Sequence, residues 1–263
     1  MKLFNKHHLA VVSGSSKGIG LAIAQSLYNE GISVIINGRS EASVTAAIKE
    51  LRSTAQSPTG ELIGFVADLS DPKEIERLHK EHPDVDIVVN NLGVYGAAAF
   101  EEITDEQWLK IFEVNVLSGV RLSRQYLPTM KQQGWGRIVF ISSESAIQIP
   151  QEMIHYGMSK TAQLAVARGL AETCTNSGVT VNSVLPGPTL TDGVEAFVRE
   201  LGGASIEQFT EDYFKNLRPS SLIKRFQKPS EIGDAVAFVC SENAASINGT
   251  AFRVDGGVVR SCF

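Results

Sequence analysis

Tyr156 and Lys160 are four residues apart, a spacing that places both side chains on the same face of a helix. An ammonium beside a phenol stabilises the phenolate and lowers the pKa of the tyrosine. The pair therefore predicts a phenol tuned for general acid/base chemistry near neutral pH. Two unrelated neighbours on a helix would show the same spacing, so the interpretation depends on the residues around it.

Two further features of the sequence favour a chemical role. Ser143 comes thirteen residues before Tyr156, at the end of an apolar run. Near the start of the chain, Gly14, Gly18 and Gly20 lie between an apolar run and a helical pattern. Glycines there permit a sharp turn and the close approach of a phosphate, and a helix N-terminus offers free N–H groups to a pyrophosphate. The spacing differs from the usual dinucleotide fingerprint, but the strand–turn–helix setting favours nucleotide binding over a purely structural turn.

Short apolar runs alternate with helical patterns along the whole chain. The runs are continuous rather than alternating, which is typical of parallel strands buried on both faces. The pattern predicts a doubly wound α/β fold of the Rossmann type, in a single domain over 1–263. The expected strands are 9–12, 32–36, 62–67, 85–90, 137–142, 179–185 and 251–254, and the expected helices include 41–54, 72–80, 104 to about 116, 119–132, the Tyr156 helix to about 176, and 229–241.

Composition excludes several classes of partner. The 263 residues carry a net charge of −5, which provides no electrostatic footprint for nucleic acid or an anionic membrane. Cys174, Cys240 and Cys262 show neither paired spacing nor a metal-type cluster, so we expect reduced thiols, no metal and a cytoplasmic location. The first eight residues are too polar for a signal peptide, and no apolar run is long enough to span a membrane.

A serine hydrolase is the competing interpretation of the glycine turn. The stretch from Gly14 to Gly18 also matches Gly-x-Ser-x-Gly, the nucleophile elbow of hydrolases. That mechanism needs an acid and then a histidine later in the chain. The histidines that follow are His79, His82 and His155, with none in the C-terminal third, and no His-Gly-Gly-Gly stretch appears. The hydrolase interpretation is therefore disfavoured.

The end of the second predicted strand bears on the choice of nucleotide. A ribose 2′-hydroxyl is normally held by an acidic residue there, but this strand ends in Asn37-Gly38-Arg39-Ser40. Arg39 suits a 2′-phosphate, and Lys17 in the glycine turn adds a second positive charge. Together they favour NADP over NAD, which stays possible. Asp68 ends the third strand, where either an adenine contact or a simple strand cap would explain it.

The chain resembles the short-chain dehydrogenase/reductase family over nearly its whole length. The ordered set of matching motifs is highly specific. Leu92 departs from the family pattern, which usually has alanine there, and would affect packing beside the cofactor. The matching residues are Gly14-x-x-x-Gly18-Ile19-Gly20, Asp68, Asn90-Asn91-Leu92-Gly93, Asn115, Ser143, Tyr156-x-x-x-Lys160, Pro186-Gly187 and Asp255-Gly256-Gly257.

The resemblance implies hydride transfer between a nicotinamide and a carbonyl or alcohol. It implies that Tyr156 is the acid/base, that Ser143 hydrogen-bonds the substrate oxygen, and that Lys160 lowers the pKa of Tyr156 and holds the nicotinamide ribose. Asn115 would support a water that links Lys160 to solvent. Neighbouring strand residues face opposite sides, so only one of Ser142 and Ser143 points at the substrate, and the offset from the tyrosine selects Ser143. The implied cofactor-binding residues are Gly14, Ser16, Lys17, Gly18, Ile19, Gly20, Arg39, Asp68, Leu69, Asn91, Gly93, Tyr156, Lys160, Pro186, Gly187 and Thr189.

These features predict an NADP(H)-dependent oxidoreductase that interconverts a carbonyl and a secondary alcohol. A 3-oxoacyl-[acyl-carrier-protein] reductase is the alternative, but Gly134 and Ser177 stand where such enzymes usually carry basic residues for the acidic carrier. A non-catalytic dinucleotide sensor is a third class, and the intact catalytic set argues against it. The resemblance also implies a homotetramer or homodimer, with the helix after Gly119 and the Tyr156 helix at an interface.

The substrate pocket is expected to form in loops around the catalytic residues. We expect Tyr95, Glu144 and Met153 to contact the substrate, together with Ser143. Glu144 would favour a polar substrate if it faces the pocket, although a carboxylate in such a loop is more often solvated.

Residues 189–228 are expected to form a lid over that pocket. Val194, Phe197, Val198 and Leu201 form one apolar stripe, and Ile206, Phe209, Tyr213 and Leu217 form a second, with Gly202-Gly203 between them as a hinge. Ordinary core or subunit interface is the other explanation of the two stripes.

Overall fold

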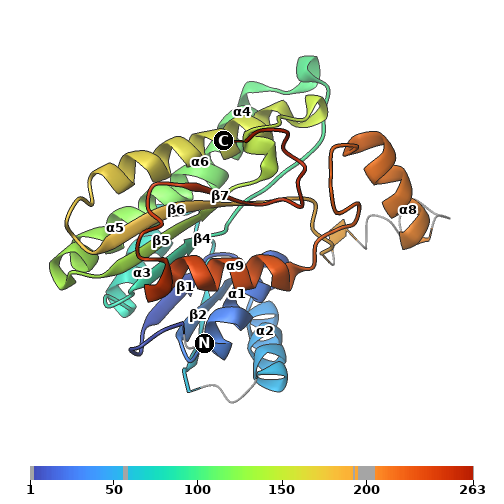
Figure 1. Ribbon diagram of the computed structural model, residues 1–263. Coiled ribbons are helices and arrows are strands. Elements are labelled where there is room, and N and C mark those ends of the chain that lie inside the picture. The colour runs from blue at the N-terminus through green and yellow to red at the C-terminus, as the bar shows by residue number, and fades with distance from the viewer. Residues whose placement is uncertain (1–2, 56–58, 192, 195–204, 263) are drawn as a thin grey trace.

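Seven parallel strands form one central sheet in the computed structural model, which describes residues 3–55, 59–191, 193–194 and 205–262 (Figure 1). The strand order is β3-β2-β1-β4-β5-β6-β7. This doubly wound, single-domain architecture confirms the predicted fold class. The strands are β1 Leu9–Val12, β2 Ser33–Gly38, β3 Leu62–Val66, β4 Ile87–Asn90, β5 Gly136–Ile141, β6 Val179–Pro186 and β7 Ala251–Val254.

Helices cover both faces of the sheet (Figure 1). Helices α1, α2 and α9 pack on one face, and α3, α5 and α6 pack on the other. The α-helices are α1 Gly18–Asn29, α2 Glu41–Thr54, α3 Pro72–Glu81, α4 Asp105–Phe112, α5 Ser118–Gln133, α6 Ile154–Glu172, α8 Ile206–Asp212 and α9 Pro229–Cys240, with short turns η1 Phe100–Glu102, η2 Glu113–Leu117, η3 Glu144–Ala146, η4 Gln151–Met153, η5 Tyr213–Leu217 and η6 Glu242–Ala244.

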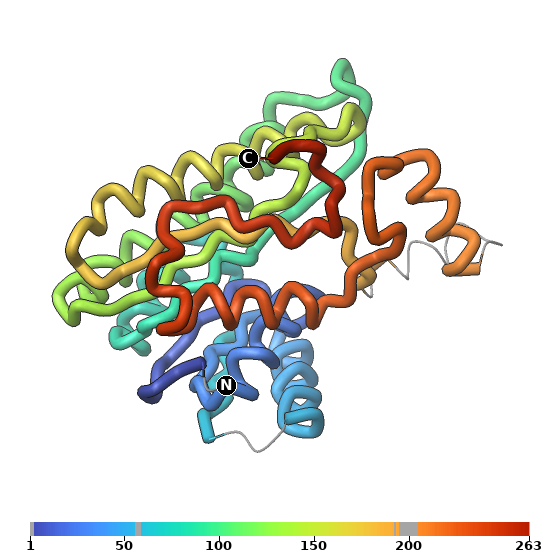
Figure 2. Tube along the Cα trace, in the orientation of Figure 1, coloured from blue at the N-terminus to red at the C-terminus, as the bar shows by residue number. Residues whose placement is uncertain are grey.

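Alternation along the strands creates the two cores. On β1, Ala10 and Val12 enter the core shared with α1 and α9, whereas Val11 enters the core shared with α3 and α5. Both sides are apolar, which explains why the strand sequences are continuous hydrophobic runs. In the view of Figure 2 the chain begins on the side of the sheet covered by α1 and α2 and ends on the side of α6.

Strand order reverses between β1 and β4, and a crevice opens there at the carboxyl ends of the strands. Ser13, directly after β1, joins its two sides. Its hydroxyl donates to the Val89 carbonyl and accepts hydrogen bonds from the amides of Asn91 and Leu92. Asn91 in turn donates to the carbonyls of Ser13 and Gly14. The two loops that border the crevice are therefore fixed to each other.

Two helices differ from the sequence expectation. The helix that carries Tyr156 ends at Glu172 rather than near Asn176, because Asn176 and Gly178 adopt positive φ angles of 57° and 71° and turn the chain into β6. The helix expected to precede Gly119 changes to a π-type turn at η2 before α5 begins. Such turns interrupt the regular helical hydrogen bonds and often occur at functional sites.

The described helical elements of the expected lid are α8 and η5, which stand beyond the carboxyl end of the sheet (Figure 1). Phe209, Tyr213 and Phe214 contact Phe226 in one aromatic cluster, in which Phe209 stacks on Phe226 and Phe214 meets it edge-on. Leu217 is 55% exposed, so the fourth position of the second expected stripe lies outside this cluster and Phe214 takes its place. Of the first stripe, Phe197, Val198, Leu201 and the Gly202-Gly203 hinge lie outside the described residues, and lid motion stays a prediction.

Among the described residues, no helix has the length and apolar character needed to cross a membrane. In the same residues, no three His, Cys, Asp or Glu side chains gather as a metal site would require.

Candidate active site

A cavity of about 550 Å³ occupies the crevice between β1 and β4. This volume is typical of a site for a small molecule or cofactor. The cavity brings together most of the residues implied for cofactor binding, which are Gly14, Ser16, Lys17, Gly18, Ile19, Gly20, Arg39, Asp68, Leu69, Asn91 and Gly93. Its walls also include residues that the sequence did not single out, among them Asn37, Ser70, Val94, Lys110, Val114, Thr191 and Gly193.

The glycine turn has the shape that a phosphate needs. Gly14 has a φ of 62°, a conformation that other residues rarely adopt. A Cβ atom at Gly20 would lie 2.4 Å from the Gly14 carbonyl oxygen and 2.5 Å from Asn91 Nδ2. No side chain caps the first turn of α1, so its N–H groups face the cavity without an internal acceptor. The turn thus fits a pyrophosphate, as expected from the sequence.

The far end of the cavity is cationic. Arg39 and Lys17 are exposed and line it. Partial burial opposes ionisation of Asp68, but hydrogen bonds from Ser70 and the charges of Arg39 and Lys110 hold its pKa below the usual value. Asn37, at the position where an acid would hold a ribose, is buried and bonded to backbone groups of Gly14, Phe65 and Ala67. Its amide is therefore committed to structure, and Arg39 is the residue free to meet a 2′-phosphate.

Ser143 and Tyr156 lie near each other at the carboxyl end of β5, where the Ser143 hydroxyl acts on the pKa of Tyr156. Ser143 follows this strand and caps η3, whereas Tyr156 lies in the first turn of α6. Ser142 has a different partner, because its hydroxyl donates to the Lys160 carbonyl at 2.9 Å.

The pKa values of Tyr156 and Lys160 differ from the expectation. Desolvation raises the pKa of Tyr156 above its usual value, the Glu144 charge adds to this rise, and the bond with Ser143 opposes it. Burial lowers the pKa of Lys160 to about 7. The Lys160 Nζ atom donates to the Ile141 carbonyl at 2.8 Å and lies 5.6 Å from the centre of the Tyr156 ring. The lysine therefore does not lower the tyrosine pKa in this arrangement, because its own charge is disfavoured and its nitrogen points elsewhere.

Asn115 is held rigidly at the π-type turn. Its side chain bonds both backbone groups of Val94, at 2.7 and 2.9 Å, and the hydroxyl of Ser159. The backbone carbonyl of Asn115 accepts a hydrogen bond from Gln163 Nε2 at 2.6 Å. Gln163 Oε1 accepts one from Lys160 Nζ at 3.3 Å. A continuous polar chain thus connects Asn115 with Lys160. A water attached to Asn115 remains an expectation from the resemblance.

The remaining cofactor candidates lie after β6. Gly187 approaches the chain before the C-terminus so closely that a Cβ atom would lie 2.5 Å from the Asp255 carbonyl oxygen. Its amide donates to Val254 and Gln227, and the Thr189 hydroxyl donates to the Gly187 carbonyl. Pro186 closes the strand. Pro186, Gly187 and Thr189 are thus held together, although the residues that line the cavity on this side are Thr191 and Gly193.

The expected substrate residues have different surroundings. Tyr95 is 69% exposed, and its ring centre lies 6.3 Å from that of Tyr156. Met153 caps α6 and is half-buried. The expectation that Glu144 would be solvated in its loop is wrong. Glu144 is 5% exposed and pairs with Arg218. Arg218 comes from the turn after η5, 74 positions away in the sequence.

Gln163 and Ser159 contact expected catalytic residues, and Arg218 contacts the expected substrate residue Glu144, but all three were missed from the sequence. Gln163 follows Lys160 by three residues and is 1% exposed. A polar residue one turn beyond the lysine on the buried face of α6 is the signal that would have indicated it. Arg218 has no such local signal.

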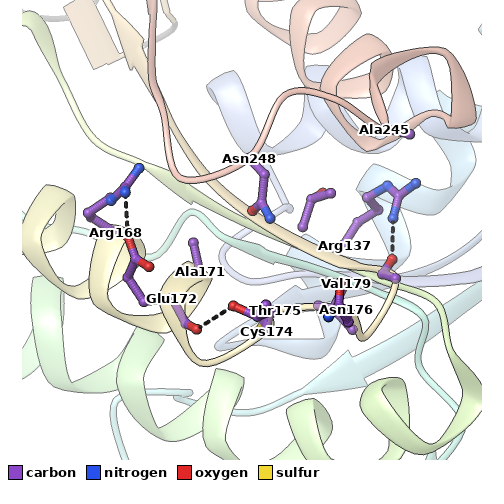
Figure 3. Close-up of a pocket in the computed structure, with 12 residues that line it drawn as sticks. Arg137, Arg168, Ala171, Glu172, Cys174, Thr175, Asn176, Val179, Ala245 and Asn248 are labelled. Carbon is purple, nitrogen blue, oxygen red and sulfur yellow. Dashed lines mark hydrogen bonds and ion pairs between the residues drawn. The ribbon is translucent and has the colours of Figure 1, made fainter.

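A second cavity of about 470 Å³ lies near the opposite ends of β5 and β6 (Figure 3). Its charged side chains are already engaged. Arg168 pairs with Glu172, and Arg137 donates to the carbonyls of Cys240, Gly136 and Gly178. None of the expected catalytic residues lines it.

The hydrolase interpretation finds no support in the geometry. The histidine rings contact other aromatic side chains: His79 meets Tyr126, His82 meets Phe65, and His155 meets Trp108. None of these contacts reaches Ser16, the serine of the alternative motif.

A model of the enoyl-(acyl carrier protein) reductase family matches residues 14–259. The chain belongs to the short-chain dehydrogenase/reductase family. It is accordingly an NAD(P)-dependent oxidoreductase of that family.

Relatives and solved structures cover the whole chain. The chain is 45% identical to the uncharacterized oxidoreductase YvaG of Bacillus subtilis (strain 168), with all of both chains covered. It is 32% identical to the D-beta-hydroxybutyrate dehydrogenase of Cupriavidus necator, with 95% of this chain and 97% of the other covered. The crystal structure of L-sorbose reductase from Gluconobacter frateurii, complexed with NADPH and L-sorbose, superposes with a TM-score of 0.91 at 28% identity, covering 99% of this chain and 100% of that one.

The lowered pKa of Lys160 predicts a pH dependence of stability. The unfolded lysine titrates near a pKa of about 10.4. Between pH 7 and that value the unfolded chain binds more protons than the folded one, so stability rises with pH. From about pH 7 to about pH 8.5 the gain is about 1–2 kcal/mol. Urea unfolding should show this slope in the wild type and lose it in Lys160→Met.

Lys73→Met, at an exposed position on α3, controls for the removal of a lysine. Equal slopes in the wild type and Lys160→Met would contradict the lowered pKa.

Proposed function

We propose that the protein is an NADP(H)-dependent oxidoreductase that interconverts a carbonyl and a secondary alcohol. The observation that carries this proposal is the position of Ser143 and Tyr156 at the end of β5, next to Tyr95, which lines the same cavity as Arg39 and Lys17. The NADPH in the L-sorbose reductase complex supports the same cofactor here.

The residues of this chain have distinct tasks in the proposed reaction. When bound, the nicotinamide supplies or accepts the hydride at the carbonyl carbon. Tyr156 donates a proton to the carbonyl oxygen, and its raised pKa keeps it protonated until the oxygen becomes basic. Ser143 holds that oxygen in place. The polar chain through Gln163 and Asn115 would hold Lys160 in place behind Tyr156.

Binding of NADP(H) would use the crevice along its length. The pyrophosphate would meet the uncapped N–H groups of α1, and Gly14 and Gly20 permit its approach. Arg39 and Lys17 would hold the 2′-phosphate, with Asp68 and Leu69 beside the adenine. Lys160 and Gly93 lie close together, since a Cβ atom at Gly93 would be 3.5 Å from Lys160 Nζ, and the ribose next to the nicotinamide would lie there.

The substrate is a small carbonyl or alcohol, with Ser143, Tyr95, Glu144 and Met153 proposed as its contacts. A panel of L-sorbose, acetoacetate and a 3-oxoacyl thioester, assayed with NADPH, separates a sugar, a short oxo acid and an acyl-carrier-type substrate. The homotetramer or homodimer expected from the resemblance and the cytoplasmic location stay predictions.

Tyr156→Phe should abolish proton donation while leaving cofactor binding intact. The expected loss in kcat is about 10²- to 10⁴-fold. NADPH fluorescence should report an unchanged Kd. Tyr126→Phe is the matched control, because Tyr126 is a buried tyrosine of α5 whose hydroxyl has no partner among the described residues. Near-normal turnover in Tyr156→Phe would reject the assignment.

Arg39→Ala should weaken NADPH far more than NADH, because a hydrogen bond to a charged group contributes about 1.5–3 kcal/mol. That range corresponds to about a 10- to 100-fold rise in the Kd for NADPH. Arg52→Ala, at an exposed position in the last turn of α2, should change neither value. Equal losses for both nucleotides would show that Arg39 does not meet the 2′-phosphate.

A further inference from the structure

The hydroxyl proton of Ser143 points at Glu144 rather than into open space. Ser143 Oγ donates to Glu144 Oε2 at 2.5 Å. A serine hydroxyl has one proton, so Ser143 cannot donate to a substrate oxygen while it donates to this carboxylate. The amide of Ser145 bonds both groups, at 3.1 Å to Ser143 Oγ and 2.9 Å to Glu144 Oε2, and keeps them side by side.

Glu144 places a negative charge where the reaction develops another one. Its side chain is 7% exposed, so water screens the charge poorly. In carbonyl reduction the substrate oxygen gains negative charge, and in alcohol oxidation the phenol of Tyr156 must give up its proton. An uncompensated carboxylate beside Ser143 and Tyr156 opposes both steps.

Arg218 supplies the compensating charge. Its Nε atom lies 3.2 Å from Glu144 Oε1, and among the described residues it is the cation that reaches this carboxylate. Its guanidinium is also fixed by the Leu217 carbonyl at 3.0 Å and by Glu152 at 3.9 Å, and lies 5.8 Å from the centre of the Tyr213 ring. The side chain is 12% exposed, so the pair is shielded from solvent.

We propose that Arg218 is a positioning residue for the reaction: by pairing with Glu144 it weakens the hold of that carboxylate on the Ser143 hydroxyl. The proton of Ser143 then becomes available to the substrate oxygen. The inference rests on the proposed function, since it assigns a role within the same site. Because Arg218 directly follows η5, it also makes the chemistry depend on where the α8–η5 segment lies.

Several other ionisable groups lie around Tyr156 and the Glu144–Arg218 pair. Tyr156 is faced by Glu144 and Tyr95 and, within its own helix, by Lys160. Glu144 and Glu152 face Arg218, and Tyr213 packs beside all three. Because Lys160 and Tyr95 are unchanged in every variant below, a difference between variants reports the Glu144–Arg218 pair.

The test is a double-mutant cycle on kcat for alcohol oxidation with NADP⁺, measured across pH. The substrate is the alcohol formed from whichever carbonyl compound of the panel the wild-type enzyme reduces fastest. Arg218→Met should lower kcat by roughly 10²-fold. It should also move the pH range over which kcat rises to higher pH by about one unit. Glu144→Gln should move this range to lower pH by a similar amount. In the double variant Glu144→Gln/Arg218→Met, removal of the arginine should lower kcat only slightly. Its pH profile of kcat should match that of Glu144→Gln.

Arg218→Lys keeps the charge and should recover part of the activity. Arg225→Met is the matched control, because Arg225 forms an exposed pair with Glu231 in the same stretch of chain and should leave the profile unchanged. Circular dichroism and thermal unfolding identify any variant that fails to fold, in which case Glu144→Gln and Arg218→Lys still decide the question.

Additive losses in the double variant, or profiles that do not move, would overturn the inference and make the pair purely structural. Failure of the proposed function would look different. Turnover by the wild type that survives Tyr156→Phe would reject the function itself, whatever the Arg218 variants show.

Discussion

Desolvation around Tyr156 and Lys160 is the constraint on which the rest of the site depends. The phenol and the amine are both held toward their neutral forms, the first by a raised pKa and the second by a lowered one. Charge that develops at the reacting oxygen must therefore be stabilised by groups already in place. Ser143, the polar chain behind Lys160, and the Glu144–Arg218 pair are the groups that the fold supplies.

The sheet makes this arrangement possible because it fixes several loops at one edge. Ser13 and Asn91 join the loops after β1 and β4 by hydrogen bonds, and the close contact of Gly20 with Gly14 leaves no room for a larger residue. The π-type turn at η2 brings Asn115 onto Val94 and Gln163. The side chains of Ser13, Asn91 and Asn115 thus have partners on other elements, which fixes this part of the site before any ligand arrives.

The sequence predicts the framework well because the framework obeys local rules. Continuous apolar runs indicated the parallel strands, and the glycine turn and the Tyr156 and Lys160 spacing indicated both ends of the site. The surroundings of Glu144 were harder to predict, since its partner Arg218 is 74 positions away. The direction of the Tyr156 pKa was also wrong, because spacing on a helix does not show that Lys160 Nζ bonds the Ile141 carbonyl. Long-range packing determines these features, and no local pattern encodes it.

The central claim is that this site moves a hydride from NADPH to a carbonyl carbon. The most direct measurement uses NADPH labelled with deuterium at C4 of the nicotinamide, with the alcohol product of the panel analysed by mass spectrometry. The account predicts one deuterium on the carbinol carbon of the alcohol in the presence of the wild-type enzyme. Product alcohol that carries no deuterium after labelling of each C4 position in turn would contradict it.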